Sequence, residues 1–312
     1  MESIASAAGV DVSKDRLDLK IPSRRVCVLP NSALGYEKVF SSLPEGMPVV
    51  VESSGGYERG LVRYLREREV KVIVLNPCRA RQFARGMGQK AKTDAIDAEF
   101  LSLAGTMMPE PLAKDREREE LGDLSRHIQR LKEDLACVKK RLLVPELAGS
   151  VTMSLFRLQK LLKEEISVLE KEFLEKVGES HLAKPYSLAL SVPGVGKVSA
   201  RILVCELPSD PHQMNAKRIS CYAGLAPIDD SSGKRTGAKR LPKGNARLKA
   251  ALYLPALVCL HRESWAKELY TRLREKGKSH QSATVALMRR LLIRVVAVIK
   301  RGTAWKPVPN ET

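Results

Sequence analysis

The sequence predicts a chain in three parts: an α/β domain over residues 1–112, a coiled-coil helical hairpin over 113–180 and a mostly α-helical domain over 181–312. Three observations support this division. Short apolar runs alternate with helical segments in the first part, a leucine seam of about three heptads follows, and basic helical segments fill the remainder. The chain has 312 residues, 44% of them hydrophobic, which is enough to bury a sizeable core.

The α/β domain is predicted from apolar runs of strand length. The clearest run is Val49-Val50-Val51, which is typical of a strand buried on both faces, and Asn76-Pro77 ends another run. Because strands and helices alternate here, we expect a mixed sheet with helices packed on it. The expected strands cover 8–12, 17–21, 25–29, 47–52 and 70–75, and a helix is expected over 60–67.

The second part carries apolar side chains at spacings of three and four residues. Pro145 and Gly149 interrupt the pattern, so we expect two helices that meet at this break. Their seam fits two arrangements, an antiparallel hairpin within one chain or a coiled coil that joins two copies, and periodicity does not choose between them. The seam residues are Leu121, Leu124, Ile128, Leu131, Leu135, Val138 and Leu142, followed by Leu155, Leu158, Leu162, Ile166, Leu169 and Phe173.

The charge of the chain indicates a polyanionic partner. Lys and Arg number 54 and Asp and Glu number 36, which gives a formal net charge of +18. This excludes an acidic activator, argues against an ordinary metabolic enzyme and favours nucleic acid over an anionic membrane surface. Aromatic residues make up only 4%, so binding should rely on phosphates rather than on base stacking.

No membrane span or zinc site is expected. The longest clean apolar run, 251–260, covers about half of the ~20 residues that a spanning helix needs. The six cysteines are scattered and form no CxxC pair, a pattern typical of free thiols in a reducing cytoplasm.

Four carboxylates of the first domain stand out by their positions. Asp11 lies at the centre of the first strand, Glu52 ends the valine-rich strand, and Asp94 and Asp97 share one face at the start of a predicted helix. An acid on a buried strand is costly unless it is paired or metal-bound. Taken singly, Asp94 also fits a first-turn acid beside a capping Thr93, and Asp11 also fits a turn residue.

Together the four acids predict a cation site at the edge of the sheet. A cluster of carboxylates repels itself unless a cation is present, and hard oxygen ligands suit Mg²⁺. Two such ions about 4 Å apart can polarise a phosphodiester. The nearby Asp15 and Asp18 are interpreted instead as turn and solvent-face residues.

Two segments of the third part suit phosphate binding. The sequence Pro193-Gly194-Val195-Gly196-Lys197 lies between predicted helices and resembles a helix-hairpin-helix motif, although a plain interhelical turn also fits. A basic loop follows; it contains no histidine, so Ser232 by itself is interpreted as a polar loop residue. The residues expected to contact phosphates are Gly194, Gly196, Lys197, Lys234, Arg235, Lys239, Arg240, Lys243 and Arg247.

In their order along the chain, these motifs resemble the IS110 family of transposases, which are recombinases of insertion sequences. Each motif is weak alone, but the ordered set, from about residue 5 to residue 300, is specific. The N-terminal motifs are Gly9-Val10-Asp11-Val12-Ser13-Lys14, Val51-Glu52 with Gly55-Gly56-Tyr57, and Lys92-Thr93-Asp94-Ala95-Ile96-Asp97-Ala98. The C-terminal motifs are Pro193-Gly194-Val195-Gly196, Ala223-Gly224-Leu225-Ala226-Pro227, Ser232-Gly233 and Lys243-Gly244-Asn245 with Arg247-Leu248.

The resemblance implies an RNase H-like (RuvC-like) N-terminal domain, a coiled-coil linker and a helical transposase domain with a helix-hairpin-helix-like motif. It implies that Asp11, Glu52, Asp94 and Asp97 bind Mg²⁺ and position the DNA phosphodiester. Ser232 would attack that phosphodiester and form a covalent 5′-phosphoserine link, although the adjacent Ser231 leaves the choice of nucleophile open.

The partners implied by the resemblance are DNA, a structured bridge RNA and further copies of the chain. Dimers would pair into tetramers, with the acids of one subunit facing the serine of another, in the nucleoid of a prokaryotic cytoplasm. Two other functions stay open: a RuvC-like nuclease that resolves Holliday junctions with metal-activated water, and a non-catalytic nucleic-acid-binding scaffold.

Overall fold

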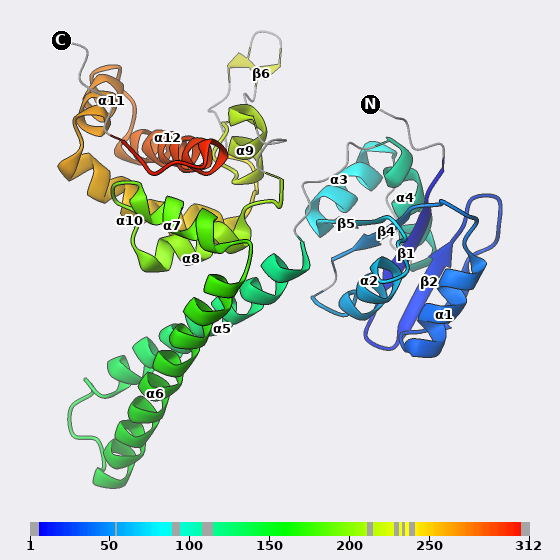
Figure 1. The fold of residues 1–312 in the computed structure, drawn as a ribbon, viewed down its shortest axis with the longest axis horizontal. Helices are drawn as coiled ribbons and strands as arrows, with labels where there is room; N and C mark the ends of the chain where they lie inside the picture. Colours follow the sequence, from blue (N-terminus) through cyan, green and yellow to red (C-terminus); the bar gives the residue numbers. More distant parts are fainter. Residues whose placement is uncertain are drawn as a thin grey trace. The chain divides into compact units, whose positions relative to one another are not determined.

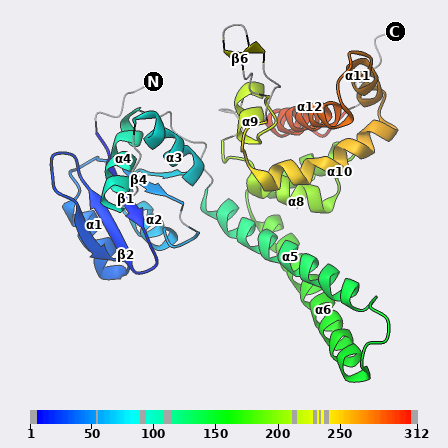
Figure 2. The same ribbon diagram turned by 180° about the vertical axis from the view of Figure 1, so that it is seen from behind.

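The computed structural model describes residues 6–53, 55–88, 94–107, 115–210, 215–227, 231–232, 235–236 and 241–306; side chains are not described at 94–96, 231–232 and 235–236. The chain divides into two compact units, Met1–Ala113 and Lys114–Thr312, drawn in Figure 1 and from behind in Figure 2. The helical hairpin and the C-terminal helices belong to the same unit, and a domain boundary at residue 180 stays a prediction.

Five short strands form one mixed sheet in the first unit, as expected. The strands are β1 (Ala8–Val12), β2 (Arg16–Lys20), β3 (Cys27–Pro30), β4 (Val49–Glu52) and β5 (Val72–Leu75). Their order in the sheet is β3-β2-β1-β4-β5. β2 runs antiparallel to β1 and β3, whereas β4 runs parallel to β1 and β5.

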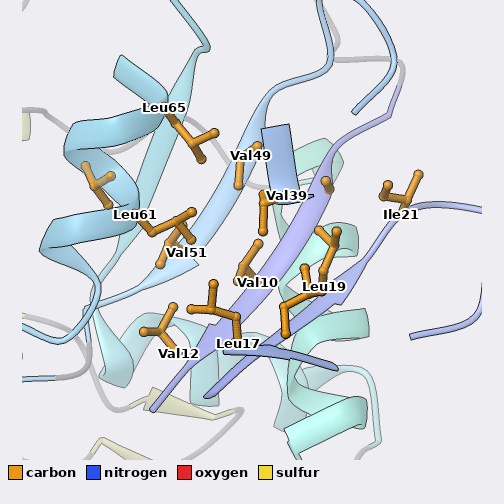
Figure 3. Packing of buried hydrophobic residues seen from close by; sticks show 13 residues of the cluster. Val10, Val12, Leu17, Leu19, Ile21, Val39, Val49, Val51, Leu61 and Leu65 are labelled. Atoms are coloured by element: carbon orange, nitrogen blue, oxygen red, sulfur yellow. The ribbon is translucent and has the colours of Figure 1, made fainter. Parts of the chain in front are cut away.

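Helices cover both faces of this sheet (Figure 1). The helices are α1 (Ala33–Ser42), α2 (Arg59–Arg66), α3 (Pro77–Gly86) and α4 (Asp94–Met107). On one face, Val39 of α1 and Leu61 and Leu65 of α2 pack with Val10 and Leu17 of the sheet, as Figure 3 shows. On the other face, α3 and α4 cover the sheet. The sequence analysis anticipated α2 and α4 but not α1 or α3.

The valine run of β4 is apolar throughout because both faces of the strand are covered. Val49, Val50 and Val51 are all fully buried. Val49 and Val51 pack beneath α1 and α2, while Val50 packs beneath α4. Each buried valine contributes about 1.5–3 kcal/mol relative to an exposed one. This strand is therefore a rigid support for Glu52, which ends it.

The second unit is mainly helical. Its elements are α5 (Arg116–Arg141), α6 (Gly149–Glu179), α7 (Ala183–Ser191), α8 (Lys197–Glu206), α9 (Ala216–Tyr222), β6 (Ser231–Ser232), β7 (Arg235–Thr236), α10 (Ala246–Arg262), α11 (Ser264–Glu275) and α12 (His280–Arg301). The glycine-rich sequence around Gly194 separates α7 from α8, as the sequence analysis predicted.

α5 and α6 pack against each other within the chain, side by side in both Figure 1 and Figure 2. Val138 of α5 is buried against Leu155 and Leu162 of α6, and Lys132 and Glu170 form an ion pair of 2.7 Å. This packing is the helical hairpin within one chain, one of the two arrangements that fit the apolar seam. α6 also exposes apolar side chains, among them Leu158, Leu161 and Val168. A coiled coil between copies therefore stays a prediction.

Two further expectations concern the whole chain. None of the helices described is both long enough and apolar enough to cross a membrane. The six cysteines are free, as expected, and burial raises the pKa of the Cys259 thiol to about 11, so this thiol stays protonated at neutral pH.

Candidate functional site

Asp11 and Glu52 occupy neighbouring positions at the carboxyl ends of β1 and β4. Val10 and Val51 are partners in the parallel register, and the predicted acid follows directly in each strand. Both acids are half-buried. Because side chains alternate along a strand, both acids lie on the face that carries Val50 and α4. The structure therefore brings these two predicted residues together.

α4 runs antiparallel to β1 and brings its first turn toward the same edge of the sheet. A Cβ atom on Gly9 would lie only 2.0 Å from the backbone oxygen of Ala98, so glycine is required for this close approach. One turn later, the Ser102 hydroxyl donates a hydrogen bond of 2.6 Å to the backbone oxygen of Ala7. Followed back toward its start, α4 thus moves along β1 from Ala7 to Gly9 and toward Asp11.

The two acids of α4 lie in its first turn. Asp94 is the first residue of the helix, and the half-buried Asp97 directly precedes Ala98. The side chain of Asp94 lies outside the part of the chain that is described. Among the described side chains, no three His, Cys, Asp or Glu lie close enough to hold a metal ion. The backbone arrangement supports a shared site, and a metal centre of all four acids stays a prediction.

Asp18 corrects one interpretation of the sequence. It is the partner of Asp11 across the antiparallel pair of β1 and β2, and it is only 2% exposed. Arg16 donates hydrogen bonds of 2.8 and 2.5 Å to its two carboxylate oxygens. We had expected a solvent face here, but α4 covers this face, and Lys20 reaches Glu99 of α4 at 3.9 Å. One buried and two half-buried acids thus form a row across three strands, and the alternation of Asp18 with its flanking leucines indicated a solvent face instead.

The predicted nucleophile lies in a small hairpin of the second unit. Ser231 and Ser232 of β6 are partnered with Thr236 and Arg235 of β7. The side chains of these residues, and the whole of Lys234, Lys239 and Arg240, lie outside the described part of the chain. The assignment of Ser232 rather than Ser231 therefore stays a prediction.

The two ends of the segment that carries Ser232 touch each other. A Cβ atom on Gly244 would lie 2.1 Å from the backbone nitrogen of Gly224, and Gly224 has a φ of +68°. Both positions therefore require glycine. Next to this contact, the backbone N–H of Asn245 donates to the backbone oxygen of Tyr222 at 2.9 Å. The motifs around Gly224 and Gly244, about twenty residues apart, thus form one structural element, here called the loop base.

The glycine-rich turn joins α7 to α8. Gly194 has a φ of +83°, and a Cβ atom there would lie 2.7 Å from the backbone oxygen of Pro255 in α10. Gly196 is the N-cap of α8, where no side chain caps the helix. Gly196 and Lys197 are exposed, so the first backbone N–H groups of α8 lie next to an exposed cation. This geometry suits the predicted phosphate contact, which stays a prediction.

The described cations of the basic loop differ in their surroundings. Lys243 is exposed. The Arg247 guanidinium lies 3.6 Å from the carboxylate of the buried Glu206, while its side chain remains 56% exposed. Glu206 therefore holds one side of the Arg247 guanidinium, and the exposed part of the Arg247 side chain is open to a phosphate.

Comparisons with known proteins agree with the order of these motifs. Residues 8–144 match a DEDD family of IS110 proteins described as "Transposase", and residues 186–271 match the "Transposase IS116/IS110/IS902 family". The first match includes the four predicted acids, and the second includes Ser232 and the glycine-rich turn. A DEDD transposase domain implies an RNase H-like fold, which agrees with the mixed five-stranded sheet.

Individual relatives cover the chain to different extents. The chain is 24% identical over 307 residues to the pilin gene-inverting protein of Moraxella bovis, which covers 94% of this chain and 95% of that protein. It is 30% identical over 166 residues to an insertion element IS110 protein of Streptomyces coelicolor, covering 53% of this chain and 38% of that protein. It is 32% identical over 122 residues to an IS900 protein of Mycobacterium paratuberculosis, covering 38% of this chain and 31% of that protein.

Proposed function

Because this chain belongs to the IS110 family of transposases and is therefore an enzyme that acts on DNA, we propose that it cuts and exchanges DNA strands through a covalent link to Ser232. The observation that carries this proposal is the pairing of Asp11 and Glu52 at the carboxyl ends of adjacent strands. Half-buried like charges are costly, and such pairs are typical of sites that handle a cation or a phosphoryl group. Similarity to a pilin gene-inverting protein over 94% of the chain supports a reaction that rearranges DNA.

The acids fit a hard divalent cation, which we assign as Mg²⁺. Asp11, Glu52, Asp94 and Asp97 would hold it through carboxylate oxygens, the ligands that Mg²⁺ prefers. When bound, the ion would offset the negative charge that develops on the phosphodiester during cleavage. Asp18 is not assigned to this set, because Arg16 occupies both of its carboxylate oxygens.

Ser232 would supply the nucleophile. Its hydroxyl oxygen forms a bond to the phosphorus and loses its proton, the bond from phosphorus to the 3′ oxygen breaks, and that oxygen gains a proton. The protein then holds the 5′ phosphate as phosphoserine, so the strand can be joined to a new 3′ hydroxyl without a free double-strand end.

The net charge of +18 suits two polyanions, DNA and a structured bridge RNA. The glycine-rich turn with Gly194, Gly196 and Lys197 would contact phosphates, as would the basic loop. The loop cations are Lys234, Arg235, Lys239, Arg240, Lys243 and Arg247. Copies of the chain would assemble as dimers that pair into tetramers, in which the acids of one subunit meet the serine of another, at the nucleoid in the cytoplasm.

The proposal is tested by incubating the protein with Mg²⁺, candidate guide RNA and labelled element-end DNA, followed by a denaturing gel. We expect a slowly migrating protein–DNA adduct with the unaltered chain and with Ser231→Ala. Ser232→Ala should form no adduct while its DNA affinity and cooperative unfolding persist.

Two results would contradict the proposal. Cleavage by Ser232→Ala at the unaltered rate, without an adduct, would indicate a nuclease that uses water. Full strand exchange by Asp11→Asn would indicate that the acids are structural.

A further inference from the structure

A buried carboxylate lies directly beneath the loop base. Glu206, the last residue of α8, is only 3% exposed. Its Oε2 accepts a hydrogen bond of 2.8 Å from the Asn245 side-chain amide. Its Oε1 lies 3.6 Å from one guanidinium nitrogen of Arg126 and 3.6 Å from one of Arg247. Because an unpaired buried carboxylate is very costly, these three partners keep Glu206 in place.

Glu206 also sets the orientation of the Asn245 side chain. A carboxylate only accepts hydrogen bonds, so the amide must turn its NH₂ group toward Glu206. The Asn245 Oδ1 then faces the backbone N–H of Leu248, from which it accepts a hydrogen bond of 3.0 Å as the N-cap of α10. A flipped amide would lose both contacts. The carboxylate thus fixes the residue at which the loop ends and α10 begins.

The position of Asn245 is coupled to the two glycines of the loop base. Gly244 precedes Asn245 and presses on the backbone of Gly224. The Tyr222 hydroxyl donates a hydrogen bond of 2.9 Å to the backbone oxygen of Glu206, and burial raises the pKa of this phenol, which keeps it a donor at neutral pH. Glu206 therefore contacts both ends of the loop. Its backbone oxygen binds Tyr222 on the entry side, and its carboxylate binds Asn245 on the exit side.

We propose that Glu206 is a positioning residue for the serine hairpin, holding the loop base so that Ser232 is presented in one orientation. This inference rests on the proposed function of Ser232. A buried carboxylate that only stabilised the fold would affect DNA binding, folding and reaction together. A positioning residue affects the rate of the covalent step, because small misplacements of a reacting group are costly while DNA affinity comes from phosphate contacts spread over the surface.

The test compares Glu206→Ala, Glu206→Gln and Asn245→Ser in the full chain, with Glu268→Ala, an exposed acid of α11, as the control. Gln can still accept from Asn245, and Ser can still cap α10 but cannot donate the same bond to Glu206. The measurements are the single-turnover rate of adduct formation at saturating DNA, the Kd for DNA, thermal unfolding and trypsin cleavage within 234–240.

We expect Glu206→Ala and Asn245→Ser to lower the rate of adduct formation about 100-fold while the Kd changes less than about threefold. Trypsin cleavage within the loop should become at least about tenfold faster, because the loop base opens locally. Glu206→Gln should recover most of the rate, and Glu268→Ala should match the unaltered chain.

The proposal is overturned if Asn245→Ser, cooperatively folded, forms the adduct and is cleaved by trypsin at the same rates as the unaltered chain. It is also overturned if rate and Kd worsen in parallel in every variant, because that pattern indicates a purely structural role. Trypsin cleavage does not depend on Ser232 chemistry. If the unaltered chain forms no adduct, the cleavage data still decide whether Glu206 holds the loop, and only the assignment of the nucleophile fails.

Discussion

The predicted acids and the predicted serine are supported in opposite ways. Asp11 and Glu52 extend from strands that are packed on both faces, and α4 presses on β1 so closely that Gly9 has no room for a side chain. Ser232 lies on a two-stranded hairpin whose described support is at its base, at Gly224 and Gly244. The comparison teaches that the positions of the acids are set by the packing of a buried core, whereas the placement of the nucleophile depends on the contacts at the loop base.

The largest effect should come from Asp11→Asn. This change keeps the shape of the side chain but removes a charge from the acid pair, so the rate of adduct formation should fall about 1000-fold. The free energy of unfolding should change little, because asparagine keeps the shape of the side chain and a hydrogen-bonding oxygen, as urea denaturation would show. A parallel loss of stability and rate would mean that Asp11 is structural and would break the comparison.

Adding one methyl group at Gly9 and at Gly244 should destabilise the protein to different extents. In Gly9→Ala the Cβ meets the backbone of α4 inside the core, so we expect a loss of about 3 kcal/mol in the free energy of unfolding. In Gly244→Ala the Cβ also meets backbone, at Gly224, but Gly244 is exposed whereas Gly9 is buried, so we expect a smaller loss of about 1–2 kcal/mol together with a slower adduct step.

Gly178→Ala is the matched control for both glycine variants. Nothing lies within 4 Å of a Cβ atom at this helical position, and alanine should stabilise the helix by up to about 1 kcal/mol. Equal destabilisation by Gly9→Ala and Gly244→Ala would refute the contrast between the buried contact at Gly9 and the contact at the loop base.

The ion pair between Arg16 and Asp18 should contribute more to the free energy of unfolding than an exposed ion pair does. Arg16→Ala leaves the Asp18 carboxylate buried without its two hydrogen bonds, and we expect a loss of about 2 kcal/mol in urea denaturation. Arg63→Ala is the comparison variant, because its pair with Glu67 is exposed on both sides and should change stability by less than about 0.5 kcal/mol. Similar losses in the two variants would argue against the burial of the Asp18 carboxylate.

Lowering the pH should reduce the stability of the second unit, by less than the loss expected for Arg16→Ala. Burial raises the pKa of Asp115, but the Arg118 backbone N–H, Ser209 and nearby cations outweigh it and hold this pKa below its ordinary value of 3.8. Burial likewise raises the pKa of Glu170, but Lys132 and Arg201 lower it below 4.5. The ionised acids therefore add stability above these ordinary values, and the stability is lost as the pH falls through the lower folded-state pKa values.

Urea denaturation between about pH 7 and about pH 3 measures this effect. The free energy of unfolding of the unaltered chain should fall toward the acid end, and Asp115→Asn should show a flatter dependence. An unchanged slope in Asp115→Asn would show that this carboxylate does not contribute.

The sequence predicted the neighbouring positions of Asp11 and Glu52 better than it predicted the loop base. Apolar runs locate β1 and β4, and a parallel register then places Asp11 beside Glu52 without further information. The burial of Asp18 could be reached only by knowing that α4, from eighty residues further on, covers that face. The role of Glu206 left no periodic signal at all, because it depends on α5, α8 and α10 meeting at one carboxylate.

The most direct measurement is identification of the residue that becomes linked to DNA. The protein is incubated with Mg²⁺, guide RNA and element-end DNA, quenched, digested with nuclease and protease, and analysed by peptide mass spectrometry. We predict one nucleotide-bearing peptide, with the phosphate attached to Ser232. An adduct on another side chain, or strand cleavage that leaves no modified peptide, would contradict the serine mechanism.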